Sequence, residues 1–368
     1  MNNEINLIFT GDIMCDNHSI MAKTNYSKFI DNSIAQNLTK ADYAIGNLEV
    51  PIVKEVRKNM PKYAFSAPVQ FARSLKDAGI NFVSTANNHC LDCGIDGLKE
   101  NIDSLDTIGL EHTGTYRTLS ESDEIFVKQI KGTKIAFLSY TYGTNAFINH
   151  QYLTQENSFH VDLLKKQEHN HVLIRKIKNK LCENANFFSY HRDKFYLQKL
   201  EKKVTVAKQK ADIVVLCLHT GGQYNKCVEH YTKRLCNFVS KLGVDLIIAN
   251  HPHVVLGARK VRNTIVFYSL GNFFATPYSN HNQKDDFPDT SIITNISIDQ
   301  ITKKVTNIEY SIVKTVLDTT PICRNIVDVY NDAPENDKQH LQQIVQQINR
   351  ILGNKNRAIK ESYKLEVA

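Results

Sequence analysis

The sequence predicts an α/β fold, and two patterns in it support this prediction. Short apolar runs of strand length recur along the chain, and between several of them lie segments whose apolar residues are spaced as on one face of a helix. Three of these helical segments are followed by glycine, which favours the left-handed backbone at a helix end. The chain has 368 residues, 42% of them hydrophobic, so it can bury a core sufficient for one large domain or two modest ones.

The apolar runs are interpreted as buried strands because they are short and continuously apolar. They are Ile5–Thr10, Tyr43–Ile45, Phe82–Thr85, Ile135–Tyr140, Ile213–Leu218, Leu246–Ala249 and Ile265–Ser269. The predicted helices are Pro68–Ala78, Ile95–Ile108 and Tyr231–Leu242, closed by Gly79, Gly109 and Gly243. Residues 291–316 change to two strand-like runs joined through Asp299–Lys304, which predicts an antiparallel hairpin and hence a mixed sheet.

The domain organisation is expected to be one main domain over residues 1–320 and a C-terminal helical extension over residues 321–368. Within the extension, residues 334–353 have the spacing of an amphipathic helix. Residues 155–210 are rich in Lys, His, Asn and Gln, and we interpret them as a basic helical insertion. The histidines of that insertion are interpreted as residues of a solvated helix and not as a metal site; they are His160, His169, His171 and His191.

Composition limits the class of protein. The net charge of +7 comes from 45 basic and 38 acidic residues, and so mild an excess predicts no nucleic-acid binding. No leader and no apolar run of 18 residues is evident, so we expect a cytoplasmic protein without a transmembrane segment. Eight scattered cysteines favour reduced thiols. Cys90 and Cys93 resemble half of a zinc knuckle, but the sequence contains no second pair at the required spacing.

Residues of metal-binding type follow five of the predicted strands. In open α/β sheets, ligands bind at the carboxyl ends of the strands. Carboxylates, amides and imidazoles are ligands for zinc, manganese or iron. Taken singly, Asp12 could instead cap a turn, and His219 could be a core histidine. The five clusters are Gly11-Asp12, Gly46-Asn47-Leu48-Glu49, Asn87-Asn88-His89, His219 and Asn250-His251-Pro252-His253.

His251 and His253 are the most specific pair among these clusters. If the segment is extended, residues at alternating positions point to the same side, so both rings could approach one metal ion or two adjacent ions. Tyr142-Gly143-Thr144-Asn145 follows another strand and could be a substrate-contacting loop or an ordinary turn. Asn272 either braces the metal-ligand loop or is purely structural.

The ordered motifs of the chain resemble those of the CapA family, the poly-gamma-glutamate capsule biosynthesis proteins. The family belongs to the calcineurin-like metallophosphatase superfamily, and the resemblance covers roughly Ile5 to Phe274. It implies a four-layer α/β/β/α sandwich with one or two divalent metal ions, Mn, Zn or Fe, at the strand ends. The motifs are Thr10-Gly11-Asp12-Ile13-Met14, Gly46-Asn47-Leu48-Glu49, Ala86 to Gly94, His219 to Tyr224, His251-Pro252-His253-Val254 and Tyr268 to Phe273.

The resemblance also implies a role for each matching residue. Metal ligands would be Asp12, Glu49, Asn88, His219, His251 and His253, with Glu49 near the place of a bridging aspartate. Asn88 would also face the phosphate, His89 would meet the leaving oxygen, and Asp92 would orient His89. Two positions depart from the superfamily pattern, although both are CapA-like: Met14 replaces a histidine, and Asn47 replaces an aspartate.

The function expected from these residues is hydrolysis of a phosphoester by metal-activated water. The substrate would be a small molecule or a polyanion. Two alternatives remain open at this point: a metal-dependent gamma-glutamyl amide hydrolase, and a non-catalytic capsule or poly-gamma-glutamate assembly or binding protein. Met14 and Asn47 favour the non-catalytic alternative, whereas intact Asn88 and His89 favour catalysis. The sequence does not indicate an oligomeric state.

Overall fold

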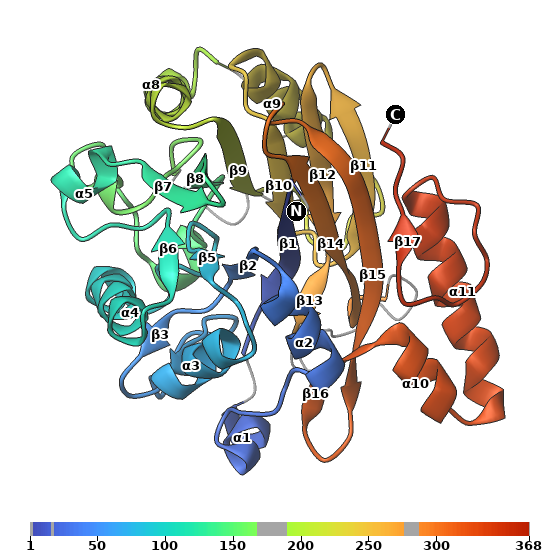
Figure 1. Cartoon of the computed structure of the whole chain (residues 1–368). Helices are drawn as coiled ribbons and strands as arrows, with labels where there is room; N and C mark the ends of the chain where they lie inside the picture. Colours follow the sequence, from blue (N-terminus) through green and yellow to red (C-terminus); the bar gives the residue numbers. More distant parts are fainter. Residues whose placement is uncertain (1–2, 16–17, 168–189, 276–286, 368) are drawn as a thin grey trace.

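A computed structural model describes residues 3–15, 18–167, 190–275 and 287–367. Two β-sheets pack face to face, and helices cover the outer face of each sheet, which gives the predicted four-layer α/β/β/α sandwich (Figure 1). The fold class expected from the sequence is therefore confirmed.

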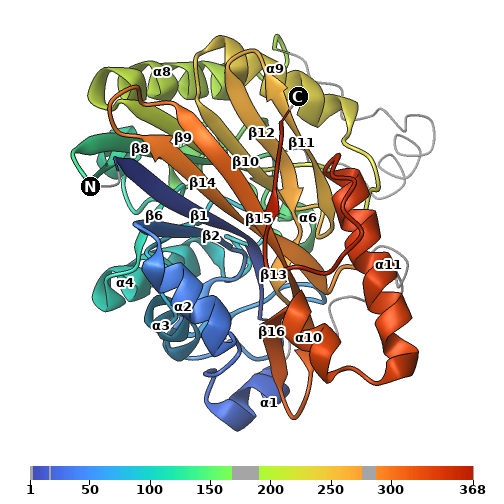
Figure 2. The same cartoon turned by 45° about the vertical axis from the view of Figure 1, so that its right-hand side comes forward.

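The first sheet is mixed. Strands β1, β2, β5 and β6 are parallel, whereas β14 pairs antiparallel with β1, β15 with β14, and β16 with β15. Its order is β16 (Pro321–Asn325), β15 (Val305–Leu317), β14 (Thr290–Asp299), β1 (Glu4–Ile13), β2 (Tyr43–Leu48), β5 (Phe82–Ser84) and β6 (Glu111–Thr113). Two short strands join it at the sides, β13 (Asn272–Phe274) beside β1 and β17 (Tyr363–Lys364) beside β15. The predicted hairpin is β14–β15, the long pair that crosses the centre of Figure 2.

The second sheet has a parallel centre and antiparallel edges. Strands β8, β9, β10 and β12 run parallel, and β7 and β11 pair antiparallel with β8 and β12. Its order is β11 (Val255–Val261), β12 (Thr264–Leu270), β10 (Leu246–Asn250), β9 (Ile213–His219), β8 (Thr133–Thr141) and β7 (Phe126–Ile130). A separate two-stranded pair consists of β3 (Ile52–Val53) and β4 (Ala67–Pro68).

Alternation along the strands divides the apolar residues between two core layers. Leu7 and Phe9 of β1 face the second sheet and pack with Phe137 of β8 between the sheets. Ile8, which lies between Leu7 and Phe9, faces outward and packs with Phe71 of α3. This period of two is what a strand buried on both faces requires, and it fixes the register of β1 in the sandwich.

The helices cover three sides of the sandwich. Helices α2 and α3 contribute to the core outside the first sheet, and α8 and α9 to the core outside the second. The helices are α1 (His18–Met21), α2 (Asn32–Lys40), α3 (Val69–Asp77), α4 (Gly94–Ile108), α5 (Leu119–Asp123), α6 (Ala146–Asn149), α8 (Lys194–Lys210), α9 (His230–Lys241), α10 (Ile326–Asp332) and α11 (Glu335–Ile351), with 3-10 turns η1 (Ala22–Thr24) and η2 (Ser158–His160).

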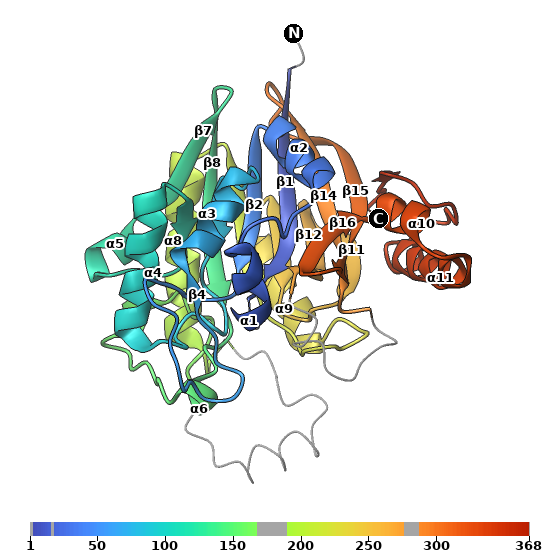
Figure 3. The ribbon, with the colours of Figure 1, turned by 90° about the horizontal axis from the view of Figure 1, so that it is seen from below.

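The C-terminal helices close the sandwich beside β11 and β15, as the view from below shows (Figure 3). The amphipathic helix expected within residues 334–353 is α11, and its Ile344, Val345 and Ile348 are buried in the core between the two sheets. Within the described ranges, no helix combines the length and apolar character needed to cross a membrane.

The basic insertion is described over residues 155–167 and 190–210, and the second of these ranges contains the whole of α8. His169 and His171 lie outside the described residues. His160 was expected in a solvated helix, and that expectation is wrong. It is buried in η2, and its Nδ1 lies 2.8 Å from the Tyr116 carbonyl oxygen, because this segment packs against the loop that follows β6.

Candidate metal centre

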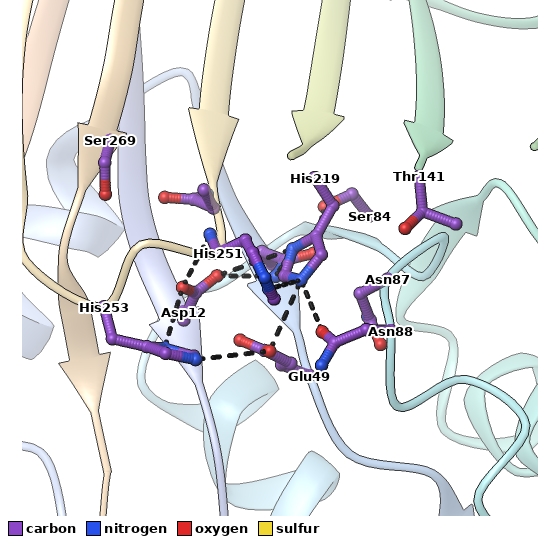
Figure 4. A network of polar contacts seen from close by, with 12 residues as sticks. Asp12, Glu49, Ser84, Asn87, Asn88, Thr141, His219, His251, His253 and Ser269 are labelled. Atoms are coloured by element: carbon purple, nitrogen blue, oxygen red, sulfur yellow. Dashed lines mark hydrogen bonds and ion pairs between the residues drawn. The ribbon is translucent and has the colours of Figure 1, made fainter. Parts of the chain in front are cut away.

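The carboxyl ends of strands from both sheets meet at one rim. Asp12 of β1 pairs in register with Asn47 of β2, and His219 of β9 pairs with Asn250 of β10. The loop after β12 approaches β1 so closely that a Cβ atom on Gly11 would lie 1.9 Å from the Gly271 carbonyl oxygen. Glycine is required at position 11 for this contact between the two halves of the rim. Figure 4 shows that the expected metal ligands Asp12, Glu49, Asn88, His219, His251 and His253 converge there.

Asp12 is fully buried and held on both carboxylate oxygens. Asn47 Nδ2 donates to Oδ1 at 2.7 Å, and the backbone N–H of His251 donates to Oδ2 at 3.1 Å. His253 Nδ1 lies 3.4 Å from Oδ2. Burial alone would raise the pKa of Asp12, but His253, His219 and Asn47 together hold that pKa below its ordinary value. Asp12 is therefore ready as an anionic ligand, the form that binds a divalent metal.

Glu49 faces the same space without a partner. Its side chain is fully buried, and within the part of the chain that the structure describes neither carboxylate oxygen has a hydrogen-bond partner. Three imidazole nitrogens surround Oε1: His219 Nε2 at 3.4 Å, His253 Nε2 at 3.8 Å and His89 Nε2 at 3.9 Å. Burial and the neighbouring Asp12 raise the pKa of Glu49 well above its usual range. A divalent cation would satisfy this carboxylate, so the residues present fit a metal.

His219 and His251 are kept neutral. Burial lowers the pKa of His219 to about 3, and burial together with the nearby His219 and His253 lowers that of His251 well below its usual value. Their ring nitrogens approach each other, with His251 Nδ1 3.0 Å from His219 Nε2. Neutral imidazole is the form that binds metals.

His253 has a different electrostatic setting. Burial would lower its pKa, but Glu49 and Asp12 raise it to about 9. Its Nδ1 donates to Asn272 Oδ1 at 2.9 Å, and Asn272 is fixed in turn by donating to the Pro288 carbonyl oxygen at 2.9 Å. Asn272 thus braces the ring and leaves Nε2 directed toward Glu49.

The backbone of the 251–253 segment differs from the expected extended form. His251 has φ 103° and His253 has φ 60°, so both residues lie in the left-handed region. The expectation that alternation in an extended segment brings the rings together is wrong, although the ring centroids do lie 5.7 Å apart. The left-handed backbone at His251 directs its N–H toward Asp12, to which it donates a hydrogen bond. Such strain, on the order of 1–3 kcal/mol per residue, clusters at functional sites.

Two overlapping sets of donor atoms are candidate ligand groups for a metal ion. One comprises Glu49, His219 and His251, and the other comprises Asp12, Glu49 and His253; in each set the donor atoms lie within 4.8 Å of one another. Glu49 belongs to both sets, which is the position a bridging carboxylate would take.

His89, Asp92 and Asn88 lie beside these donors. His89 Nδ1 is 2.7 Å from Asp92 Oδ2, which leaves Nε2 facing Glu49. Asp92 is held by the N–H of Phe65, 2.8 Å away. Asn88 Oδ1 lies 2.6 Å from His219 Nε2, and its Nδ2, a buried donor, has no partner among the residues described. All the expected site residues therefore come together.

Some residues at the rim were missed or underrated in the sequence. From the sequence, Asn47 is only a departure from the superfamily pattern. In the structure its Nδ2 donates to Asp12 and lies 3.2 Å from His219 Nδ1, so it links the two residues. Ser84 donates to Asn47 Oδ1 at 2.9 Å. Tyr142 OH lies 2.9 Å from His251 Nε2, as the substrate-loop interpretation allowed. Lys165 stacks over the Tyr142 ring at 4.8 Å, and no sequence pattern marks it.

A family model described as the bacterial capsule synthesis protein PGA_cap matches residues 6–277, a range that contains every candidate site residue. The chain belongs to this family. It is 27% identical over 281 residues to the capsule biosynthesis protein CapA of Bacillus anthracis, covering 74% of the chain and 60% of that protein. It is 26% identical over 272 residues to the PGA biosynthesis protein CapA of Bacillus subtilis, covering 72% and 62%. The matches thus span about three fifths of these PGA_cap relatives.

Solved structures similar to this PGA_cap member include a phosphatase from Mycoplasma pneumoniae and a 5'-nucleotidase from Candida albicans. The first is 15% identical, covers 85% of the chain and 95% of its own, and has a TM-score of 0.41. The second is 10% identical, covers 94% and 58%, and has a TM-score of 0.43. Because these sequence identities are so low, only the residues of this chain itself bear on its chemistry.

Proposed function

We propose that this PGA_cap member is a metal-dependent hydrolase that cleaves a phosphoester. The observation that carries the proposal is Glu49: a fully buried carboxylate with no hydrogen-bond partner for either oxygen in the described chain, surrounded by three imidazoles. Without a cation at this position, burial of this unsatisfied carboxyl group would lower the stability of the fold with no compensating interaction.

The proposed ligands are Asp12, Glu49, Asn88, His219, His251 and His253. This mixture of oxygen and imidazole donors suits Mn, Zn or Fe, and the two overlapping donor sets allow one or two ions. When bound, such ions supply Lewis acidity, which lowers the pKa of water and withdraws charge from a phosphoryl oxygen.

The protein's own residues supply the rest of the chemistry. With Asp92 accepting from Nδ1, a protonated His89 presents Nε2–H toward the metal-ligand cluster, where it can donate a proton to the leaving oxygen. General-acid help of this kind contributes about 10²–10⁴-fold. The unpartnered Asn88 Nδ2 is placed to donate to a phosphoryl oxygen as negative charge develops on it.

Lys165 supports an anionic substrate. Its ammonium group lies over the rings of Tyr142 and Tyr231, at 4.8 and 5.7 Å from their centroids, and its charge contributes to the lowered pKa of His251. A positive charge this close to the proposed centre favours binding of a phosphorylated small molecule or a polyanion.

The test combines metal analysis with turnover. Purified protein should contain stoichiometric Mn, Zn or Fe and hydrolyse an aryl phosphate. His89→Ala should reduce kcat by about 10²–10⁴-fold while metal content is retained. His112→Ala is the matched control, because His112 lies outside the candidate site and pairs with the exposed Asp106, 3.1 Å away. Protein that neither contains nor binds metal, or His89→Ala with wild-type turnover, would exclude the proposal.

A gamma-glutamyl anilide assayed beside the aryl phosphate distinguishes the bond that is cleaved. Faster turnover of the anilide would replace the phosphoesterase assignment by an amide hydrolase with the same centre. If metal is bound but neither substrate nor a phosphodiester is turned over, a binding or assembly role becomes the better account.

Domain limits and location remain predictions from the sequence. We propose a main domain of residues 1–320, with 155–210 inserted, and a mainly helical extension of residues 321–368 that also adds β16 and β17 to the first sheet. A chain ending at residue 320 tests the division, and it should unfold at lower temperature because α11 contributes to the core between the sheets. Cell fractionation tests the expected cytoplasmic location.

A further inference from the structure

A cavity of about 130 Å³ lies at the outer face of the second sheet, away from the candidate metal centre. Helix α8 forms one wall, and α5, η2 and the end of β8 form the others; α5 and α8 lie on the same side of the molecule as β7 and β8 in Figure 1. None of the candidate metal-site residues lines it. Most of the lining side chains are apolar or aromatic, including Ile125, Phe159, Val161, Tyr196 and Val206.

Helix α8 presents a basic stripe to this cavity. Lys199, Lys202, Lys203 and Val206 follow one another at helical spacing, so they lie on one face of α8, and all four line the cavity. The stripe belongs to the basic insertion, to which the proposed hydrolysis assigns no role.

One lysine of the stripe is already neutralised. Lys203 Nζ lies 2.7 Å from both oxygens of Asp162 and 3.1 Å from Tyr116 OH. Asp123 is the other acid in the lining. Three ammonium groups against two carboxylates leave a net charge of +1 at the cavity wall.

Lys199 is partly buried in the wall, whereas Lys202 is exposed. The Nζ of Lys199 donates to Ser158 Oγ at 3.3 Å. Burial lowers the pKa of Lys199; Asp162 acts in the opposite direction, the like charge of Lys203 lowers the pKa further, and Asp123 raises it. A bound anion would relieve both the desolvation and the repulsion.

Tyr140 provides a donor at the same place. It lines the cavity, its side chain is fully buried, and its hydroxyl has no hydrogen-bond partner among the described residues. Buried tyrosine hydroxyls usually have a partner, so an unpaired hydroxyl in a cavity wall points to a ligand that accepts a hydrogen bond from it.

We propose that this cavity binds a small carboxylate with an apolar body about the size of one six-membered ring. A dry cavity of about 150 Å³ accommodates benzene, which sets the size of the body. The carboxylate would pair with Lys199 and accept a hydrogen bond from Tyr140, and the apolar walls would enclose the ring. This site is separate from the proposed hydrolase centre and does not depend on it.

The test uses benzoate as the probe, with neutral benzamide and cationic benzylamine as controls of the same shape. Titration followed by NMR should show saturable binding of benzoate, with benzamide at least about 10-fold weaker, because it lacks the charge-assisted hydrogen bond. Chelator-treated protein should bind benzoate equally well, which separates this site from carboxylate binding to a metal ion.

Two variants locate the site. Lys199→Met keeps the aliphatic packing and should weaken benzoate binding by about 10-fold or more, whereas Lys210→Met, at the exposed end of α8, should not change it. Tyr140→Phe should weaken binding by about 3- to 10-fold without loss of stability, since it removes only an unpartnered hydroxyl.

Crystals soaked in 4-bromobenzoate should show a bromine peak between α8 and β8. Unchanged affinity in both Lys199→Met and Tyr140→Phe, a bromine peak at the metal centre alone, or no saturable binding would overturn the proposal. Metal-dependent turnover is unaffected by these outcomes, so failure here is distinguishable from failure of the proposed function.

Discussion

Replacing Glu49 by Gln should change stability in opposite directions without and with metal. In metal-free protein the buried carboxylate has no hydrogen-bond partner in the described chain, and such a group costs about 1–3 kcal/mol. Glu49→Gln removes the charge at nearly constant volume, so we expect a gain of about 1–2 kcal/mol in the free energy of unfolding. For 368 residues the unfolding entropy is about 0.8 kcal/mol/K, so this gain corresponds to about 1–3 °C in Tm.

Metal should reverse the order of the two proteins. At free Mn²⁺ about 100-fold above Kd, the wild type gains about 2.7 kcal/mol, or about 3.5 °C. We take the variant to bind Mn²⁺ about 100-fold more weakly, which is the upper end of the losses in metal affinity seen when residues that support metal ligands are replaced. The stabilisation of the variant by Mn²⁺ then falls to about 0.4 kcal/mol. Scanning calorimetry with and without Mn²⁺ measures both quantities, and the exposed Glu361→Gln should behave as wild type in each.

The pH dependence of this difference has a definite sign. The pKa of Glu49 is raised in the folded protein, so its contribution to stability is present at low pH and is lost as pH rises through the folded-state value. In metal-free protein the advantage of Glu49→Gln should therefore grow as pH rises above the ordinary glutamate pKa of 4.5 and through the raised folded-state value. Two results would refute the reasoning. One is an equal shift in Tm on addition of Mn²⁺ in the two proteins, and the other is a metal-free variant that is less stable than wild type by about 1 kcal/mol or more.

Three further changes test other parts of the structure. Asn272→Ala should lower metal affinity by about 10–100-fold in calorimetric titrations, because His253 loses its brace; unchanged affinity would contradict that role. Lys165→Gln should raise KM for an aryl phosphate by about 10-fold with kcat nearly constant, whereas a fall in kcat alone would argue against ground-state binding. Phe137→Ala should cost about 3–5 kcal/mol in guanidinium unfolding, and a loss below about 1 kcal/mol would place it outside the core.

The fold class and the positions of the site residues were predictable from the sequence because both depend on local patterns. Apolar runs and helical spacing identify the elements, since the periods of strands and helices are properties of neighbouring residues. Asp12, His219 and His251 then stand directly after predicted strands, and parallel strands bring their carboxyl ends to one edge. That geometry gathers such residues at the edge of each sheet, and Asp12 meets His219 and His251 because the two sheets pack face to face.

The contacts that shape the centre depended on distances that the sequence does not contain. The N–H of His251 reaches Asp12 across 239 positions, and it does so through a left-handed turn that sequence pattern assigned to extended chain. The role of Asn47 became visible only when Asp12 and His219 were seen on either side of it.

By itself, then, the sequence determined which residues stand at strand ends and which side chains of metal-binding type they carry. Tertiary structure alone decided that Glu49 has no hydrogen-bond partner among the described residues, that Lys165 reaches the rim, and that α8 forms a cavity with Tyr140. The physical reason is that periodicity acts between neighbours in the chain, whereas burial, electrostatic coupling and cavity shape arise between residues that only packing brings together.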